Sequence, residues 1–347
     1  MPIVQSRRDF LAGMSATGAA CVLGPRASLA DEAPPEVTTI RLWAEAVPKT
    51  VNSFSDVAIC FAPQYVAEDL LRAEGFTEIH YTPLPSGPAL AEAFERGEID
   101  FTSRFAPGAL RHLDAGVPFT VLAGLHLGCL ELVAHDPIRT VADLKGKHVG
   151  INAGSGSADQ LFVSITAAYV GLDPEKDINW VFAADDIDPK QLFIQGKVDA
   201  YNASTADAWE LRARKIGHVI LDVGLDRPWS QYFCCILVGH RDFVSQYPVA
   251  TKRAVRAILK ATDLCATAPE EAAQRLVDGG FAQYDYAFQT LKGLPYNVWR
   301  EFDPEDAVRF WALWMHQFGL LKSTPNKLLA EGTDWRFLNE LKRELKA

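Results

Sequence analysis

Residues 94–101 read FERGEIDF, and residues 193–200 read FIQGKVDA. Both octets place a glycine three residues, and an aspartate six residues, after a phenylalanine. Such a glycine is typical of the point where a helix ends, because glycine readily adopts the left-handed conformation required there. Three matching positions are weak evidence alone, so the flanking sequence must show whether the octets are equivalent.

The flanking sequence repeats as well. Apolar runs with strand-like and helix-like spacing alternate in the same order around both octets. The helix-like runs end at glycines that form three pairs, separated by 96 to 101 residues: Gly75 and Gly171, Gly97 and Gly196, Gly116 and Gly217. We therefore predict one strand–helix unit built twice, which gives an α/β fold with two similar lobes and mostly parallel sheets.

The repeated part contains six expected helices, at residues 63–75, 88–96, 107–116, 158–170, 189–195 and 206–215. Beyond Gly239 the pattern becomes helical, with helices at residues 248–266, from Asp303-Pro304, and after Thr333-Asp334. The second of these carries an aromatic stripe, which we interpret as a docking face rather than a cofactor site: Phe310, Trp311, Trp314 and Phe318.

The order of the elements predicts how the chain is divided. After an acidic, proline-rich linker at residues 31–36, the first lobe should take residues 37–127 and the second residues 128–232. Residues 233–347 should return to the first lobe and add the C-terminal helices. Two crossings between lobes would form a hinge, so closure around a ligand is the expected motion.

Residues 1–30 have the pattern of a twin-arginine signal peptide. Arg7-Arg8 precede a short apolar run, and the small residues before Asp31 suit cleavage there. The expected partner in export is the twin-arginine translocase, and the mature protein should be periplasmic. Lipid anchoring at Cys21 is the alternative, but Gly18 stands where a lipobox usually has leucine.

The charge and the cysteines exclude several classes of function. The chain carries a net charge of −10, and cleavage after residue 30 removes three arginines and one aspartate, leaving −12. Nucleic acid is therefore not an expected partner. The five remaining cysteines have the spacing of neither a zinc site nor a disulfide framework. We expect Cys234 and Cys235 to face opposite sides of a strand rather than pair with each other.

Recognisable catalytic motifs are absent from the sequence. It has no H-E-x-x-H pair, G-x-S-x-G elbow or Walker loop, and its eight histidines are scattered. We therefore predict no catalytic residues, no metal site and no cofactor.

The segment GINAGSGSADQLF nearly matches a dinucleotide-binding fingerprint, but Asp159 stands where the third glycine would be. The backbone N–H groups of Ser155, Gly156 and Ser157 could still form a cradle for an anion at a helix start. The alternative is a purely structural capping box made by Ser157 and Gln160.

Ligands of α/β sheets lie beyond the carboxyl ends of the strands, and two facing lobes would bring both sets of strand ends into one cleft. Arg104 follows one of these strands and could bind an anionic group, although a structural salt bridge would also explain it. The aromatic candidates could be core residues instead. The predicted ligand-binding residues are Trp43, Gln64, Arg104, Phe105, Ser155, Gly156, Ser157, Tyr201, Asn202, Trp229 and Tyr232.

Nearly the whole chain after residue 30 resembles the periplasmic substrate-binding proteins of ABC importers. The type is the nitrate/sulfonate/taurine one (NitT/TauT), which includes thiamine-pyrimidine binders. The segments that carry the resemblance are APQYVAEDLLRAEGF, ERGEIDF, VLAGLHLGCLELVAH, DLKGKHVGI, AAYVGLDPEKDINWV, RARKIGHVI, RPWSQYFCC and GTDWRFLNELKREL.

The resemblance implies a two-lobed periplasmic binding protein of the Venus-flytrap kind, expected to be a monomer. It would capture a small solute, such as a sulfonate, nitrate or taurine-like anion, and deliver it to a membrane permease driven by a cytoplasmic ATPase. A thiamine-pyrimidine-type heterocycle binder and a receptor that presents its ligand to a sensor are the alternatives. A pyrimidine-synthase-like enzyme is a further one, because Cys234-Cys235 are similar to a cysteine-rich feature of that group.

Overall fold

A computed structural model describes residues 32–45, 59–84, 87–184 and 186–345. The stretch Pro35–Ala347 forms one compact unit. The predicted signal peptide lies outside the described residues, so it remains a prediction. Among the described residues, no helix has both the length and the apolar composition needed to cross a membrane.

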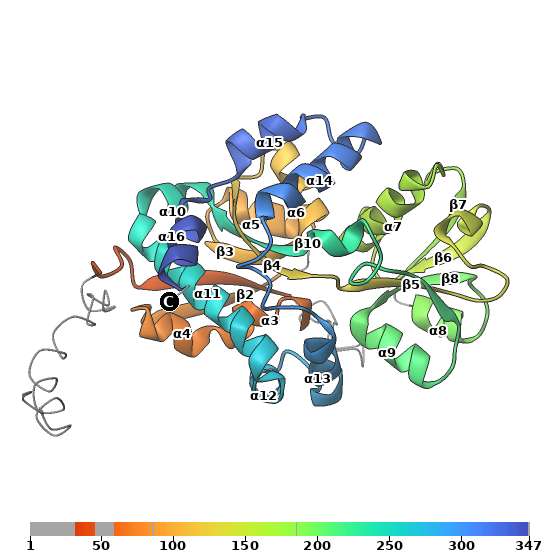
Figure 1. Cartoon of the computed structure of the whole chain (residues 1–347), viewed down its shortest axis with the longest axis horizontal. Helices are drawn as coiled ribbons and strands as arrows, with labels where there is room; N and C mark the ends of the chain where they lie inside the picture. The colour runs from red at the N-terminus through yellow and green to blue at the C-terminus, as the bar shows by residue number, and fades with distance from the viewer. Residues whose placement is uncertain (1–31, 46–58, 85–86, 185, 346–347) are drawn as a thin grey trace, which may run out of the picture. The chain divides into compact units, whose positions relative to one another are not determined.

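The strands form two five-stranded sheets (Figure 1). The first has the order β2–β1–β3–β10–β4, with strands Glu78–Leu84, Thr39–Glu45, Phe101–Phe105, Phe233–His240 and Phe119–Leu127. The second has the order β7–β6–β8–β5–β9, with strands Ile178–Phe182, Lys147–Ile151, Ala200–Ser204, Leu130–Ala134 and His218–Asp222. Lobe 1 denotes the first sheet with the helices packed on it, and lobe 2 the second sheet with its helices.

The two sheets have equivalent topologies, which confirms the predicted repeat. In each, the first strand of the unit pairs in parallel with the second and the third. In each, a strand from outside the unit lies between the third and the fourth and runs antiparallel to its neighbours: β10 in lobe 1 and β5 in lobe 2. The sequence did not predict these insertions, because strand neighbours are set by tertiary pairing and not by local pattern.

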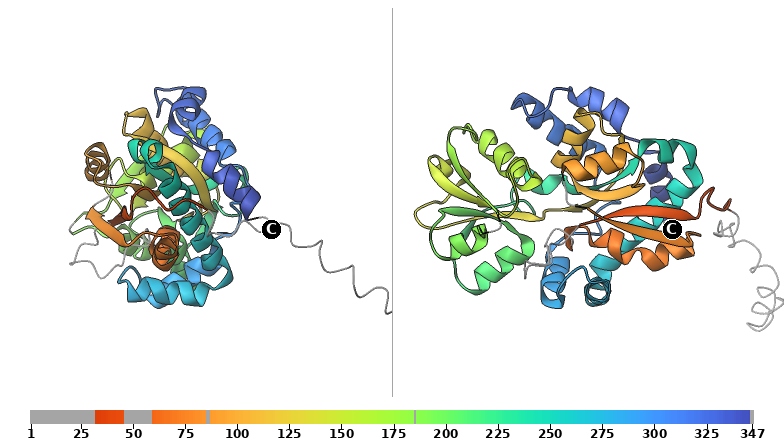
Figure 2. Two further views of the ribbon diagram at one scale, coloured as in Figure 1. Left: turned by 90° about the vertical axis from the view of Figure 1, so that its left-hand side faces the viewer. Right: turned by 180° about the vertical axis from the view of Figure 1, so that it is seen from behind.

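Helices cover both sides of the lobe 1 sheet (Figures 1 and 2). One side carries α5 (Pro88–Glu95), α6 (Ala106–Asp114), α14 (Pro304–Gln317) and α15 (Pro325–Gly332). The other carries α3 (Ala62–Val66), α4 (Glu68–Ala73), α11 (Pro248–Thr267) and α12 (Pro269–Asp278). The short helix α10 (Arg241–Gln246) and the last helices α13 (Tyr284–Gly293) and α16 (Arg336–Glu344) complete the lobe.

Lobe 2 has α7 (Ala158–Tyr169) on one side and α8 (Pro189–Ile194) and α9 (Thr205–Ala213) on the other (Figure 1). Short 3₁₀ turns lie at η2 (Val141–Leu144) and η3 (Trp229–Gln231). All six predicted helices of the repeat are present, although the first is divided at Ala67 into α3 and α4. The six paired glycines all have positive φ angles, as the prediction of left-handed helix ends requires.

Candidate functional site

Trp43 in β1 and Arg104 in β3 lie near the carboxyl ends of two strands of the same sheet. The Arg104 guanidinium carbon is 5.4 Å from the centroid of the Trp43 ring, which is a cation–π distance. Arg104 is 5% exposed and Trp43 is fully buried. The structure therefore brings these two predicted residues together and holds a permanent positive charge at the strand ends of lobe 1.

Gln64 has a positioning role. Its side-chain amide donates to the carbonyl oxygen of Trp43 at 2.7 Å and accepts from the backbone N–H of Ser103 at 2.7 Å. The residue is fully buried. Because both ends of the amide hold backbone groups, Gln64 fixes the separation of β1 and β3, and through them the positions of Trp43 and Arg104.

Three predicted aromatic residues belong to a packed cluster on the other side of the sheet. Successive strand residues point to opposite faces of a sheet, so Phe105 lies on the face opposite Arg104. There it contacts Trp311 of α14, with ring centroids 6.0 Å apart. Trp229 stacks on Trp311 at 5.5 Å, and Tyr232 stacks on Phe310 at 3.9 Å. The aromatic stripe of α14 is thus a docking face, as predicted, and it occupies Trp229 and Tyr232 as well.

The turn before α7 is internally bonded. The Gly156 N–H donates to the Gln160 side chain at 2.6 Å, and the Ser157 N–H donates to the Gly154 carbonyl at 3.2 Å. Ser157 also caps the helix, since its hydroxyl accepts from the Gln160 N–H at 3.3 Å. Two of the three donors of the predicted anion cradle are therefore engaged, and the capping alternative describes this turn better. Ser155 is exposed.

Tyr201 points into the core of lobe 2. It is fully buried, and its hydroxyl donates to Asp207 at 2.7 Å. Asp207 pairs in turn with Lys190. This network holds α8 and α9 on the sheet, so the structure does not bring Tyr201 to the strand ends where Trp43 and Arg104 lie.

Asn202, the next residue, points to the α7 side, and there it meets a residue that was not among the predicted site residues. Its side-chain N–H donates to Asp159 at 3.3 Å. Burial raises the pKa of Asp159 to about 6, and the Asn202 hydrogen bond opposes that shift. The sequence did contain a signal for Asp159, because it replaces a glycine in a loop that otherwise resembles a phosphate-binding turn.

Several contacts join the lobes, among them the ring pair of Tyr169 in α7 and Trp314 in α14, whose centroids are 4.8 Å apart. Arg111 of α6 donates to the carbonyl of Gly156, and a β-carbon placed on Gly108 would lie 3.7 Å from that of Ala158. Elsewhere Tyr286 of α13 donates to Glu210 of α9 at 3.0 Å. The starts of α6 and α7, which follow Arg104 and precede Asp159, are therefore adjacent.

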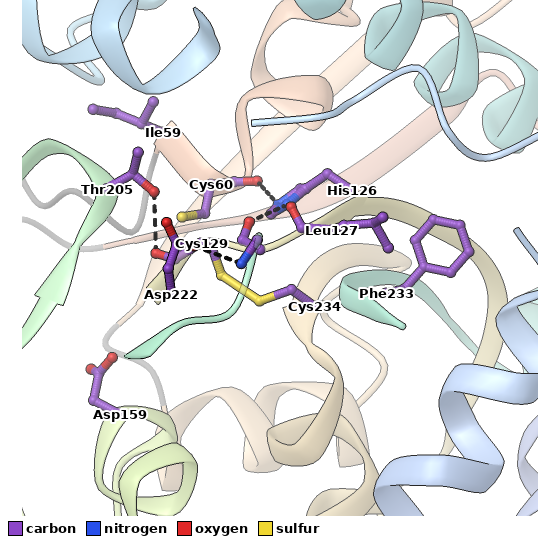
Figure 3. The surroundings of a disulfide bond; sticks show 12 residues. Ile59, Cys60, His126, Leu127, Cys129, Asp159, Thr205, Asp222, Phe233 and Cys234 are labelled. Carbon is purple, nitrogen blue, oxygen red and sulfur yellow. Dashed lines mark hydrogen bonds between the residues drawn. A yellow bond between two sulfur atoms is a disulfide. The ribbon is translucent and has the colours of Figure 1, made fainter. Parts of the chain in front are cut away.

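The two chain segments that connect the sheets meet at a pair of glycines. A β-carbon on Gly128 would lie 2.5 Å from the Cα of Gly224, so no side chain fits there. Next to this contact the imidazole of His126 faces the carbonyls of Cys60 at 2.9 Å and Gly128 at 3.1 Å (Figure 3). Burial lowers the pKa of His126, which favours a neutral ring.

A disulfide between Cys129 and Cys234 links the same two segments (Figure 3). The prediction that the cysteines lack a disulfide framework was therefore wrong. The pair is separated by 105 residues, and only the pairing of β4 with β10 brings the two residues together. Cys235 remains a buried free thiol, so the neighbouring cysteines do not pair with each other, as predicted.

The sulfur atoms of Cys129, Cys234 and Cys235 lie within 4.8 Å of one another, a cluster that their spacing in the sequence did not indicate. With two of the sulfurs bonded to each other, one thiol is left as a metal ligand, which is too few for a stable site. Burial raises the pKa of the Cys235 thiol well above its ordinary value, so this thiol is not a nucleophilic thiolate.

A cavity of about 170 Å³ lies elsewhere, between α6, α15 and the start of α10. Asp114, Arg241, Lys327 and Glu331 contribute to its lining. None of the predicted ligand-binding residues lines it.

Comparison with known proteins identifies relatives of this architecture. The fold matches the periplasmic nitrate-binding protein NrtA from Synechocystis PCC 6803 with a TM-score of 0.71 and 16% identity, covering 90% of each chain. It also matches the periplasmic aliphatic sulphonate-binding protein SsuA from Escherichia coli, with a TM-score of 0.63 and 20% identity over 87% of this chain and 91% of that one. The predicted fold class, a two-lobed periplasmic binding protein, is thereby confirmed.

Sequence comparison gives a closer assignment. Proteins described as binding proteins from Brucella abortus and Brucella suis are 26% identical over 190 residues, which is 54% of this chain and 57% of theirs. The match therefore spans little more than half the length of these relatives. The NMT1/THI5-like family model matches residues 63–272, which include most strands of both sheets. On that match the chain belongs to the NMT1/THI5-like family.

Proposed function

We propose that this protein is the solute-binding component of an ABC importer, binding a small anionic solute between its lobes and delivering it to a membrane permease. The observation that carries the proposal is the fold, shared over about nine-tenths of the chain with periplasmic proteins named for nitrate and sulfonate binding. The family match over residues 63–272 supports it.

Arg104 supports the anionic nature of the solute. Its guanidinium is buried at a strand end, stacked on Trp43, and held by a backbone that Gln64 fixes. A guanidinium held in this way is suited to bind a carboxylate, sulfonate or nitrate with charge-assisted hydrogen bonds. Trp43 is fully buried and orients the guanidinium through the cation–π contact.

Binding rather than catalysis is the proposed role. The enzyme alternative was suggested by Cys234-Cys235, but Cys234 is bonded to Cys129 and the Cys235 thiol is buried and protonated. Neither is placed to act as a nucleophile. The export signal at residues 1–30 remains part of the proposal and would bring the mature protein to the periplasm.

Hinge closure is the proposed mechanism of capture. A solute that contacts both lobes favours the closed state only through contacts that the open state lacks. We propose that residues 37–127 with 233–347 move as one body and residues 128–232 as the other. Rotation would occur at the crossings, where Gly128 contacts Gly224 and the disulfide limits separation. Release to a permease requires only moderate affinity, about −8 to −10 kcal/mol.

A calorimetric binding screen with nitrate, alkanesulfonates and carboxylates tests the proposal. The Arg104→Ala variant should bind the identified anion about 1.5 to 3 kcal/mol more weakly, because a charge-assisted hydrogen bond is lost. Arg96→Ala is the matched control, since Arg96 is an exposed arginine of the same lobe that pairs with Glu98. Equal affinities for the wild-type protein and Arg104→Ala would show that Arg104 is structural.

A further inference from the structure

The lobe 2 half of the proposed site presents hydrogen-bond acceptors where the sequence predicted donors. The N–H groups of Gly156 and Ser157 are engaged within their own turn. The next polar groups beyond this turn are the carboxyl group of Asp159 and the buried amide of Asn202. The turn before α7 therefore does not provide a second anion cradle.

Asp159 is a carboxyl group with little compensation for its charge. Among the described residues its carboxyl group accepts a hydrogen bond from Asn202 and one from its own backbone N–H, and none of the ion pairs found there includes it. Burial and the negative charge of Asp207 both raise the pKa of Asp159. An N–H donor, and above all a protonated amine, would stabilise the ionised form.

Asn202 gives an independent indication of the same kind. The residue is 3% exposed, and its side-chain oxygen Oδ1 has no hydrogen-bond partner among the described residues. The orientation of the amide is fixed by Asp159, because turning it over would place two acceptor oxygens against each other. A buried unpaired carbonyl oxygen is costly, about 1 to 3 kcal/mol, so a bound donor is its natural complement.

The position of the pair places it beside the rest of the proposed site. Asp159 lies on the first turn of α7 near the interlobe disulfide (Figure 3). Its neighbour Ala158 lies against Gly108 of α6, the helix that begins two residues after Arg104. The end of the strand that carries Arg104 and the start of the helix that carries Asp159 are thus close together, one on each lobe.

We propose that Asp159 and Asn202 form a donor-binding subsite, which takes the protonated amine or amino N–H of a solute whose anionic end is bound in lobe 1. This inference rests on the proposed function and narrows it. A solute with an anionic group alone has no positive charge to pair with Asp159. A solute with both charges pairs its anionic group with Arg104 in lobe 1 and its amine with Asp159 in lobe 2. Asp159 and Asn202 are then the residues that determine specificity.

The test uses five probes on the full mature protein: propanesulfonate, its ω-amino derivative, butyrate, its ω-amino derivative, and propylamine. Affinities are measured by calorimetry at about pH 8, where an aliphatic amine is protonated and Asp159 is ionised. We expect at least one amino derivative to bind about tenfold or more tightly than its plain partner.

Two variants of Asp159 test the assignment. Asp159→Asn keeps the shape and removes the charge, and Asp159→Ser is a smaller, neutral second variant. Either should weaken binding of the amino derivative about tenfold to a hundredfold and leave the plain anion unchanged or tighter. Glu175→Gln is the matched control, because Glu175 is exposed and lies at the opposite end of the same sheet, before β7.

The outcomes separate this inference from the proposed function. Plain anions that bind as tightly as their amino derivatives would overturn the donor subsite and leave the proposed function standing. Binding of propylamine alone, lost in Asp159→Asn, would support the subsite and overturn the anionic assignment. Binding of none of the five probes would overturn the donor subsite, and nitrate binding in the calorimetric screen would then decide the proposed function.

Discussion

Asp100 of lobe 1 and Asp199 of lobe 2 have the same backbone role in different surroundings. Each accepts a hydrogen bond from a backbone N–H of the first strand of its unit, Asp100 from Arg41 at 2.7 Å and Asp199 from His148 at 2.8 Å. The Asp100 side chain is 2% exposed and is also bound by the Arg41 guanidinium. The Asp199 side chain is 39% exposed, and its ion-pair partner among the described residues is the His148 ring, at 3.5 Å. The octets at residues 94–101 and 193–200, here called the joints, therefore encode the same backbone hydrogen bond. The surroundings of each joint determine how much that bond stabilises the protein.

The same contrast holds for the charged groups of each lobe. In lobe 1 Arg256 binds Glu74 through two hydrogen bonds of 2.8 and 2.6 Å, with both residues almost fully buried. In lobe 2 the pair formed by Lys190 and Glu210 is partly open to solvent. Partial burial acts to raise the pKa of Glu210, but hydrogen bonds, first among them the one from Lys190, lower this pKa to about 2. Because its charges are the more deeply buried, the Arg256–Glu74 pair should be more sensitive to substitution than the Lys190–Glu210 pair.

The largest expected effect comes from Glu74→Ala. It leaves Arg256 buried without its main carboxylate partner, which should lower the free energy of unfolding by about 3 to 5 kcal/mol. Glu68→Ala on the same helix is the control, because its pair with Arg72 is exposed and should contribute less than about 0.5 kcal/mol. Urea unfolding measures both, and similar losses would show that burial does not distinguish the two pairs.

The aspartates of the two joints should differ by an intermediate amount. Asp100→Ala should lower the free energy of unfolding by about 3 kcal/mol, since a buried N–H and a guanidinium lose their acceptor. Asp199→Ala should lower it by about 1 kcal/mol, because water can replace the exposed carboxylate. Equal losses in urea unfolding would show that the shared backbone bond dominates both joints.

The smallest expected effect is a difference in pH dependence. Burial, with the charges of Arg104 and Arg111, lowers the pKa of His112 in lobe 1 to about 4. Between about pH 4 and pH 6.5 the unfolded state therefore binds more protons at this histidine than the folded state does. The contribution of His112 to stability rises with pH over that interval. The pKa of Asp159 in lobe 2 is raised to about 6, so the folded state binds more protons and stability falls as pH rises through 6.

Urea unfolding at intervals from about pH 4 to pH 7 separates the two terms. His112→Gln should flatten the rise, and Asp159→Asn should steepen it, each by on the order of 1 kcal/mol across the window. Wild-type slopes in both variants would contradict the two pKa shifts.

The helices and the joints of this protein were predictable because their signals are local. Gly97 and Gly196 end helices through their own backbone freedom, and α7 begins at the serine that the sequence indicated as its cap. The strand order was only partly predictable, since nothing in β5 or β10 specifies insertion beside β8 or β3. Those neighbours depend on long-range pairing.

The candidate site shows the same limit. Arg104 and Trp43 could be named from their places after strands, and the structure brings them together. Gln64, Phe105 and Tyr201 follow strand ends or helix starts as well, but alternation along the strand and packing direct them into the interior. Position along the chain locates a strand end, but it does not show which face a side chain occupies once helices are packed on the sheet.

By itself the sequence determined the repeated unit, the α/β class and the resemblance to binding proteins, because glycine positions and apolar periodicity act over a few residues. Only the tertiary structure decided that Cys129 meets Cys234 across 105 residues and that Asp159 meets Asn202. Contacts of this kind form between elements far apart in the chain, and they depend on how two sheets are assembled rather than on any local preference.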